Sequence, residues 1–111
     1  MDNQHRKITG YRELDPQEIE LINEIKDKGA ELLALHARAV RLLGDQRDHK
    51  REEAAKAHAM TRMGEETGAA IAEYSRFAEA EPERWAAIAK TDIQTGVMAL
   101  VRAIAQPGGG V

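Results

Sequence analysis

Apolar residues in the first half of the chain recur at steps of three and four, which is the period of an amphipathic α-helix. The stripe comprises Ile19, Ile22, Ile25, Gly29, Leu32, Leu35 or His36, Ala39 and Leu42, and it is widened by Leu33 and Leu43. Just before it, Asp15 fits the N-cap, Pro16 the first helical position and Glu18 the third, which completes a capping box. Because Gly44-Asp45 is typical of a helix stop, the pattern predicts a helix over residues 15–43.

The middle of the chain, residues 45–79, is also predicted to be helical, although it opens on a run of charged residues. Helical apolar spacing returns at Met60, Met63, Thr67, Ile71, Tyr74 and Phe77. We expect a break or a close helix crossing near Gly64 or Gly68, which have the small-xxx-small spacing. A second break is expected at 79–82, because Pro82 cannot lie deep inside a helix.

A last helix is predicted over residues 82–105, with its apolar area on Trp85, Ile88, Val97, Leu100, Val101 and Ile104. It leaves a flexible tail over 107–111, while residues 1–14 form an arm with a turn at Gly10. No stretch of useful length alternates apolar and polar residues as a strand does. The chain is therefore predicted to be one all-α domain of 111 residues, with a short N-terminal arm and long antiparallel helices in a helical hairpin or bundle.

The composition indicates that these helices form a thin hydrophobic core. Only 4% of the residues are aromatic, and the abundant alanines favour helix but bury little area. Packing between copies would bury more, so we expect a homo-oligomer. With 42% hydrophobic and 32% charged residues the chain is too apolar to be disordered. It has no apolar run that could span a membrane and no apolar signal-peptide segment at its N-terminus.

Charge and cysteine content exclude several functions. The net charge of −3 argues against binding of long DNA or RNA, but it leaves room for a small anion in a local basic pocket. Cysteine is absent, which excludes disulfides, thiol catalysis and cysteine-ligated zinc.

Residues that could carry out catalysis or bind metal are few. There is no Gly-x-Ser-x-Gly, phosphate-binding glycine loop or His-Glu-x-x-His, and Ser75 is the one serine. His49 has Glu52 and Glu53 at carboxylate–histidine spacing, but no other pair repeats it. We therefore predict that residues 45–58 form a solvent-exposed helix without metal, and that the protein has no catalytic residues and no cofactor.

The N-terminal arm has the most suggestive chemistry. Tyr11 lies between the flexible Gly10 and the cation Arg12, with Arg6 and Lys7 nearby. A tyrosine ring can stack on a nucleobase while cations bind phosphate. The alternative is that Tyr11 packs the arm against the helix and the cations are solvated, and the residue types alone favour this alternative. Further along, Lys26 and Lys28 add positive charge to the first helix.

Two stretches of sequence help to decide between these two interpretations of Tyr11. Residues 5–14 read His-Arg-Lys-Ile-Thr-Gly-Tyr-Arg-Glu-Leu, and the pattern continues over 18–26 as Glu-Ile-Glu-Leu-Ile-Asn-Glu-Ile-Lys and on to Gly29. The second stretch is residues 85–107, and over 94–107 it reads Gln-Thr-Gly-Val-Met-Ala-Leu-Val-Arg-Ala-Ile-Ala-Gln-Pro. Together they resemble the second anti-CBASS protein family of bacteriophages. No motif of that family is found over about 44–80.

The resemblance implies a function. CBASS is a bacterial immune system that signals infection with cyclic di- and trinucleotides, and this family acts as a sponge that binds these messengers without cleaving them. The resemblance further implies a homo-hexamer in the cytoplasm of the infected host, with dinucleotides such as cyclic GMP-AMP held between protomers. Tyr11 would stack on a base and Lys26 would contact the ligand, with Gly10, Arg12 and Lys28 as weaker candidates. Trinucleotides would bind a separate site, for which Arg84, Trp85 and Thr91 are candidates.

Helix geometry agrees with a site shared between chains. Lys26 lies ten residues beyond Pro16, which is about 15 Å along the helix axis, while Tyr11 precedes the helix. One small ligand is reached more easily by these two residues from different chains. Two other functions stay open: a helical module that binds a protein partner through its apolar stripes, and an enzyme that degrades cyclic nucleotides. Hydrolysis would require a base or metal cluster that the sequence does not display.

Overall fold

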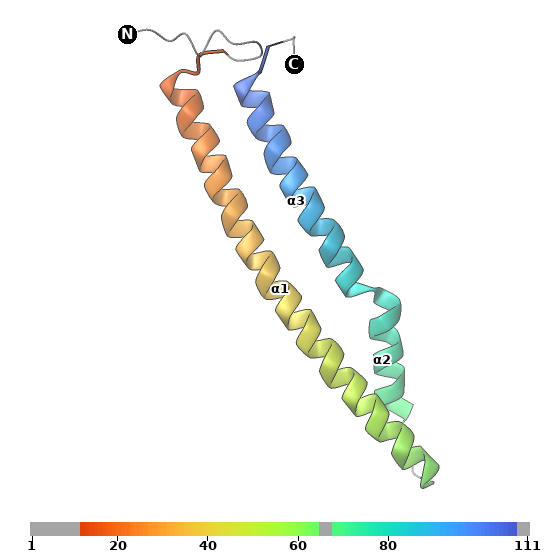
Figure 1. The fold of residues 1–111 in the computed structure, drawn as a ribbon. Coiled ribbons are helices and arrows are strands. Elements are labelled where there is room, and N and C mark those ends of the chain that lie inside the picture. The colour runs from red at the N-terminus through yellow and green to blue at the C-terminus, as the bar shows by residue number, and fades with distance from the viewer. Residues whose placement is uncertain (1–11, 65–67, 109–111) are drawn as a thin grey trace. The chain divides into compact units, whose positions relative to one another are not determined.

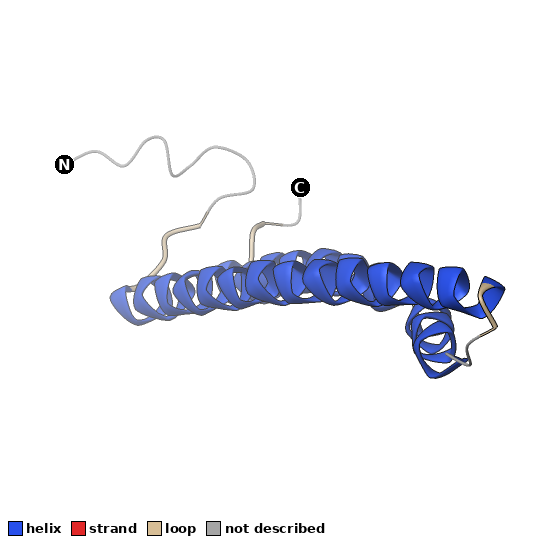
Figure 2. Ribbon diagram, turned by 90° about the horizontal axis from the view of Figure 1, so that it is seen from below, coloured by secondary structure: helices blue, strands red, loops and turns tan. Residues whose placement is uncertain are grey.

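The computed structural model describes residues 12–64 and 68–108, and its regular structure is helical throughout (Figure 1). The helices are α1 (Pro16–Arg62), α2 (Gly68–Ala80) and α3 (Pro82–Ala105). No strand occurs among the described residues (Figure 2). The predicted all-α class is therefore confirmed. Most of the predicted arm, and the last three residues of the predicted tail, lie outside the described residues.

The start of α1 has the capping box that the sequence predicts. The backbone N–H of Glu18 donates to Asp15 Oδ1 at 2.8 Å, and the backbone N–H of Asp15 donates to Glu18 Oε1 at 3.1 Å. The N–H of Ile19 donates to the Asp15 carbonyl at 3.1 Å, which is the first helical hydrogen bond. Because these bonds satisfy donors that a helix start otherwise leaves unpaired, they fix the first turn of α1.

The predicted helix end at Gly44-Asp45 is wrong. The helix α1 has 47 residues and passes through Gly44 without interruption. A glycine inside a helix costs only about 1 kcal/mol relative to alanine, and the good helix formers on both sides outweigh it. The helix ends later, at Arg62, and Gly64, two residues further on, has a left-handed φ of 92°. The break expected near Gly64 or Gly68 is thus confirmed, since α2 begins at Gly68.

The break expected at residues 79–82 is also confirmed, as is the helix predicted over 82–105. Between α2 and α3 lies Glu81, with a left-handed φ of 50°, and Pro82 then occupies the first position of α3. The end of α3 has the same pattern: Gln106 has a φ of 47° and Pro107 follows. A left-handed residue followed by proline ends both α2 and α3, because the proline ring cannot continue the preceding turn.

The structure divides into two compact units. The terminal unit consists of Met1–Leu33 and Thr91–Val111, and the central unit consists of Ala34–Lys90. In the terminal unit the start of α1 runs antiparallel to the end of α3 (Figure 1). In the central unit the rest of α1 packs with α2 and the start of α3.

The core of both units is thin, as the composition predicts. Among the described residues, the buried hydrophobic side chains are Ile22 in the terminal unit and Ala54, Ala57 and Phe77 in the central unit. Much of the predicted stripe on α1 is exposed, with Ile19, Leu32, Leu35 and Leu42 at 46%, 47%, 53% and 57%. Within one chain, the neighbouring helices therefore cover only part of the apolar stripe of α1.

Candidate functional site

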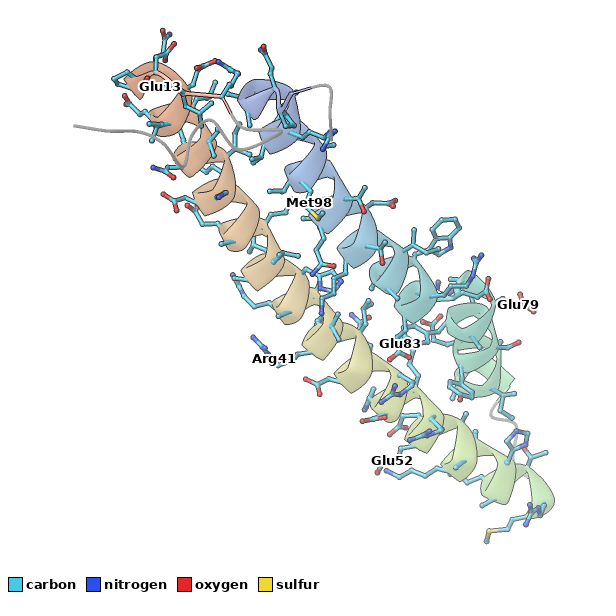
Figure 3. All side chains as sticks on the ribbon, turned by 45° about the horizontal axis from the view of Figure 1, so that its top comes forward. Glu13, Arg41, Glu52, Glu79, Glu83 and Met98 are labelled. Atoms are coloured by element: carbon cyan, nitrogen blue, oxygen red, sulfur yellow. The ribbon has the colours of Figure 1, made fainter. Side chains whose placement is uncertain are left out.

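Two adjoining apolar grooves lie in the terminal unit, and Lys26 lines both. One has a volume of about 400 Å³ and is lined by Lys26, Gly29, Ala30, Leu33, Gln94, Val97 and Met98. The other has about 360 Å³ and is lined by Lys26, Val97, Met98, Val101, Arg102, Ala105 and Pro107. Lys26 comes from α1, while Val97 and Met98 come from α3. Figure 3 labels Met98 on α3. The grooves therefore follow the line where these two helices meet.

The sequence of α1 explains why Lys26 is found there. Ile22, Lys26, Gly29 and Leu33 are spaced by four, three and four residues and share one face of the helix. Gly29 allows α3 to come close, because a Cβ built on it would lie 2.8 Å from Val97 Cγ2. Lys26 is thus placed on the face of α1 that meets α3, with an apolar lining around its stem.

The electrostatics distinguish Lys26 from its neighbours. Lys26 makes no ion pair with any of the residues that the structure describes, and it is exposed. Lys28, two residues on, pairs with Glu31 at 3.6 Å on an exposed part of α1. The other cation that lines the grooves is Arg102. Two positive side chains beside apolar grooves can bind an anion that also has apolar faces.

Arg12, predicted as a weaker ligand candidate, binds the protein itself. Its Nε donates to the Ala105 carbonyl at 2.8 Å, and its Nη2 donates to the Ile104 carbonyl at 2.9 Å. Nη2 also donates to Glu18 Oε2 at 2.6 Å, and this hydrogen bond is the main cause of the lowered pKa of Glu18. The sequence gives no signal for these contacts, because the carbonyl groups lie 92 and 93 residues away.

The remaining predicted site residues fall in different places. Gly10 and Tyr11 lie outside the described residues. Arg84 and Trp85 are in the central unit, where the Arg84 guanidinium lies 5.2 Å from the centre of the Trp85 ring and pairs with Glu81 at 3.7 Å. The Trp85 side chain is 58% exposed. Thr91, the third candidate for the trinucleotide, belongs to the terminal unit.

The central unit instead has a network of ion pairs. Glu73 of α2 accepts from Arg76 at 2.7 Å and from Lys50 of α1 at 2.9 Å, and the two cations lower the pKa of Glu73 to about 2. Arg47 of α1 pairs with Glu83 of α3 at 2.7 Å. Lys50 also lies 5.9 Å from the centre of the buried Phe77 ring. These contacts hold α2 and the start of α3 to α1.

The described residues contain neither a cluster of metal-ligating side chains nor a helix that could span a membrane. They contain no group of three or more histidine, cysteine, aspartate or glutamate side chains placed to hold a metal ion, and His49 is exposed. None of the helices in the described part of the chain is long and apolar enough to span a membrane.

Comparison with known proteins identifies the family. Residues 3–105 match the family described as Acb2/Tad1, hairpin domain, and the chain belongs to that family. It is also similar to the protein named Anti-CBASS protein 2 from Pseudomonas phage JBD67. The two are 58% identical over 109 residues, which cover 98% of this chain and 99% of the relative. The predicted anti-CBASS resemblance is confirmed, and it extends through residues 44–80, where no motif was found from the sequence.

Proposed function

We propose that this protein counters CBASS immunity for a phage by binding cyclic di- and trinucleotides and holding them uncleaved in the infected bacterial cell. The observation that supports this best is Lys26, a cation without an ion-pair partner among the described residues, beside two apolar grooves. A cyclic dinucleotide combines two phosphates with two flat bases. A lysine binds the phosphate, and an apolar groove accepts the base or the sugar.

The grooves suit retention better than cleavage. Their polar lining side chains, among the residues described, are Lys26, Gln94 and Arg102. None of these is a carboxylate or an imidazole, the side chains that most often act as general bases. A hydrolytic mechanism would need such a base, or a metal-bound water, at the phosphate.

The site is shared between copies of the chain in this proposal. Tyr11 from one protomer stacks on a base, while Lys26 from another contacts the same ligand, because about 15 Å of helix separates Lys26 from the start of α1. The exposed Leu32, Leu35 and Leu42 supply apolar area for contacts between protomers. The assembly is a homo-hexamer.

Trinucleotides bind elsewhere in this proposal. Arg84 and Trp85 are the first candidates, because an exposed indole ring can stack on a base while the adjacent guanidinium binds phosphate. Thr91 is a further candidate for this site.

The test is retention followed by release. The protein is incubated with cyclic GMP-AMP, free ligand is removed by filtration, and the retained protein is heated and its supernatant analysed by chromatography. We expect intact cyclic GMP-AMP after heating. Linear or monomeric products would identify an enzyme, and no retention would favour a module that binds a protein partner.

A matched pair of variants shows whether retention depends on the groove. Lys26→Ala removes the lysine that lines it and is expected to weaken binding roughly ten- to a hundredfold, since a charge-assisted contact is worth about 1.5–3 kcal/mol. Lys56→Ala removes a lysine from the same helix that is already paired with Glu52 and Glu53. Equal losses in both variants would rule out the groove as the site.

A further inference from the structure

The two grooves beside Lys26 share part of their lining but differ in their second polar side chain. Lys26, Val97 and Met98 line both grooves. The groove of about 400 Å³ also has Gln94, and the groove of about 360 Å³ also has Arg102. Each groove thus combines an apolar lining with one hydrogen-bonding side chain of its own, and the lysine is common to both.

The sequence of α3 places the distinguishing residues on one face of the helix. Gln94, Met98 and Arg102 are spaced by four residues, so they follow one another along the helix with a rise of about 6 Å per step. Met98, labelled in Figure 3, comes between the two polar residues and is 71% exposed. Because a methionine thioether makes favourable contacts with aromatic rings, Met98 can pack against a flat base in either groove.

Both polar side chains have hydrogen-bonding groups available to a ligand. Gln94 and Arg102 are exposed, and their side chains make no hydrogen bond or ion pair with any residue in the described part of the chain. Arg12 differs in this respect, because its guanidinium already donates to two backbone carbonyls and to Glu18. The two grooves can therefore select a ligand by hydrogen bonding.

Glutamine and arginine recognise different purines. One edge of adenine presents an acceptor at N7 and a donor at N6, which match the amide N–H and the amide oxygen of glutamine. The same edge of guanine presents two acceptors, N7 and O6, which match two N–H groups of a guanidinium. Arginine has no acceptor for the donor of adenine, and the amide oxygen of glutamine has no donor to meet on this edge of guanine.

We propose that the two grooves bind the two bases of one cyclic dinucleotide, with Gln94 hydrogen-bonded to adenine, Arg102 to guanine and Lys26 to a phosphate. Their volumes lie near the lower end of the range for small-molecule sites, about 300–1,000 Å³, so each groove suits one base with its sugar. Cyclic GMP-AMP matches both grooves, whereas cyclic di-AMP and cyclic di-GMP each mismatch one. This inference rests on the proposed function, in which the dinucleotide lies beside Lys26.

The test is calorimetry with three ligands: cyclic GMP-AMP, cyclic di-AMP and cyclic di-GMP. Wild type should bind cyclic GMP-AMP about five- to tenfold more tightly than either of the others, the lower end of what a bidentate pair discriminates, because both side chains are exposed. Arg102→Gln should increase the preference for cyclic di-AMP over cyclic di-GMP by about fivefold or more. Gln94→Arg should shift the same preference toward cyclic di-GMP by a similar factor.

Matched controls make the same changes of charge away from the grooves. Arg41→Gln and Gln46→Arg alter residues of α1 that line neither groove and whose side chains have no hydrogen bond or ion pair among the residues described. Both should keep the wild-type preference between the two symmetrical dinucleotides. Glutamine and arginine are good helix formers, so all four variants should fold, which thermal denaturation checks. If one groove variant is unstable, the variant of the other groove still tests the inference.

Several outcomes would overturn the inference. Equal weakening of all three ligands by both groove variants would mean that the side chains bind phosphate or ribose, which every cyclic dinucleotide has. An unchanged preference in both variants, a shift in the same direction in both, or equal wild-type affinity for the three ligands would mean that these residues do not select the bases. If wild type binds none of the ligands, the proposed function itself fails. If wild type binds them and the groove variants do not shift in opposite directions, only the assignment of the bases fails.

Discussion

The two units of this protein use their charged side chains differently. In the central unit, several cations form ion pairs: Arg47 with Glu83, Lys50 and Arg76 with Glu73, and Lys56 with Glu52 and Glu53. In the terminal unit, Arg12 binds backbone carbonyls and Glu18, and Lys26 lines apolar grooves without an ion-pair partner among the described residues. Several cations of the central unit therefore hold its helices together, whereas in the terminal unit Lys26 lies beside apolar grooves.

The difference shows where a small anion can bind on a chain that is negative overall. A net charge of −3 repels polyanions at long range, but a local cation beside apolar surface still attracts a small anion. The same contrast predicts which substitutions change stability without changing affinity. Changes in the core and ion pairs of the central unit should alter folding without altering the affinity for the dinucleotide, and changes along the α1–α3 contact of the terminal unit should alter both.

The largest expected effect is in the core of the central unit. Phe77 is 6% exposed and is the largest buried side chain among those described, so Phe77→Ala should cost about 3–5 kcal/mol of unfolding free energy. Thermal denaturation at fixed protein concentration measures the cost. The affinity of the protein that remains folded for cyclic GMP-AMP should stay near wild type. A large fall in that affinity would contradict the division of roles between the units.

The next largest effect is expected at the close contact of Gly29 in the terminal unit. Gly29→Ala places a Cβ 2.8 Å from Val97 Cγ2, and such overpacking costs about 1–3 kcal/mol, reduced by the better helix propensity of alanine. Val97→Ala in the same chain should relieve the clash, and a double-mutant cycle of denaturation energies measures this. Binding should weaken too, because the groove beside Lys26 has the same lining residues.

A matched glycine substitution provides the control for Gly29→Ala. Gly44 lies in the same helix, but a Cβ built there would meet only Arg47 Nη2, at 3.9 Å. Gly44→Ala should therefore stabilise the protein by up to about 1 kcal/mol. Stabilisation by Gly29→Ala of similar size would show that α3 does not approach α1 closely at Gly29.

The smallest expected effect is the pH dependence of the central unit. Arg76 and Lys50 lower the pKa of Glu73 from its ordinary 4.5 to about 2 in the folded state. Because the folded pKa is the lower one, the stabilisation is present above about pH 4.5 and is lost as the pH falls toward 2. Glu73→Gln should be less stable than wild type at pH 6, and the difference should shrink at pH 2. A constant difference across this range in acid denaturation would contradict the role of Glu73.

Local sequence signals predicted the fold well where the controlling interactions are local. The capping box at Asp15 and Glu18, the break before Pro82 and the break at Gly64 all depend on residues within a few positions. The helix end expected at Gly44 was wrong because a single glycine is compatible with two local structures. It can end a helix in a left-handed conformation, as Gly64 does, or lie within one at a small energetic cost.

The candidate site was predictable only in part. Lys26 was selected through a family resemblance, and its place beside the grooves depends on Val97 and Met98, about 70 residues away. The anchor made by Arg12 joins residues more than 90 positions apart, so no short-range pattern indicates it. Sequence periodicity predicted the apolar stripe of α1, but it could not tell which of its residues a neighbouring helix of the same chain covers.

The most direct test of the shared dinucleotide site is a titration of mixed oligomers. Tyr11→Ala and Lys26→Ala should each bind cyclic GMP-AMP ten- to a hundredfold more weakly by calorimetry, while light scattering shows the oligomer intact. When the two variants are dissociated together and reassembled, some sites combine the intact Tyr11 of one chain with the intact Lys26 of another. The account predicts that wild-type affinity returns in that fraction of sites. Wild-type affinity in both single variants, or no recovery in the mixture, would contradict it.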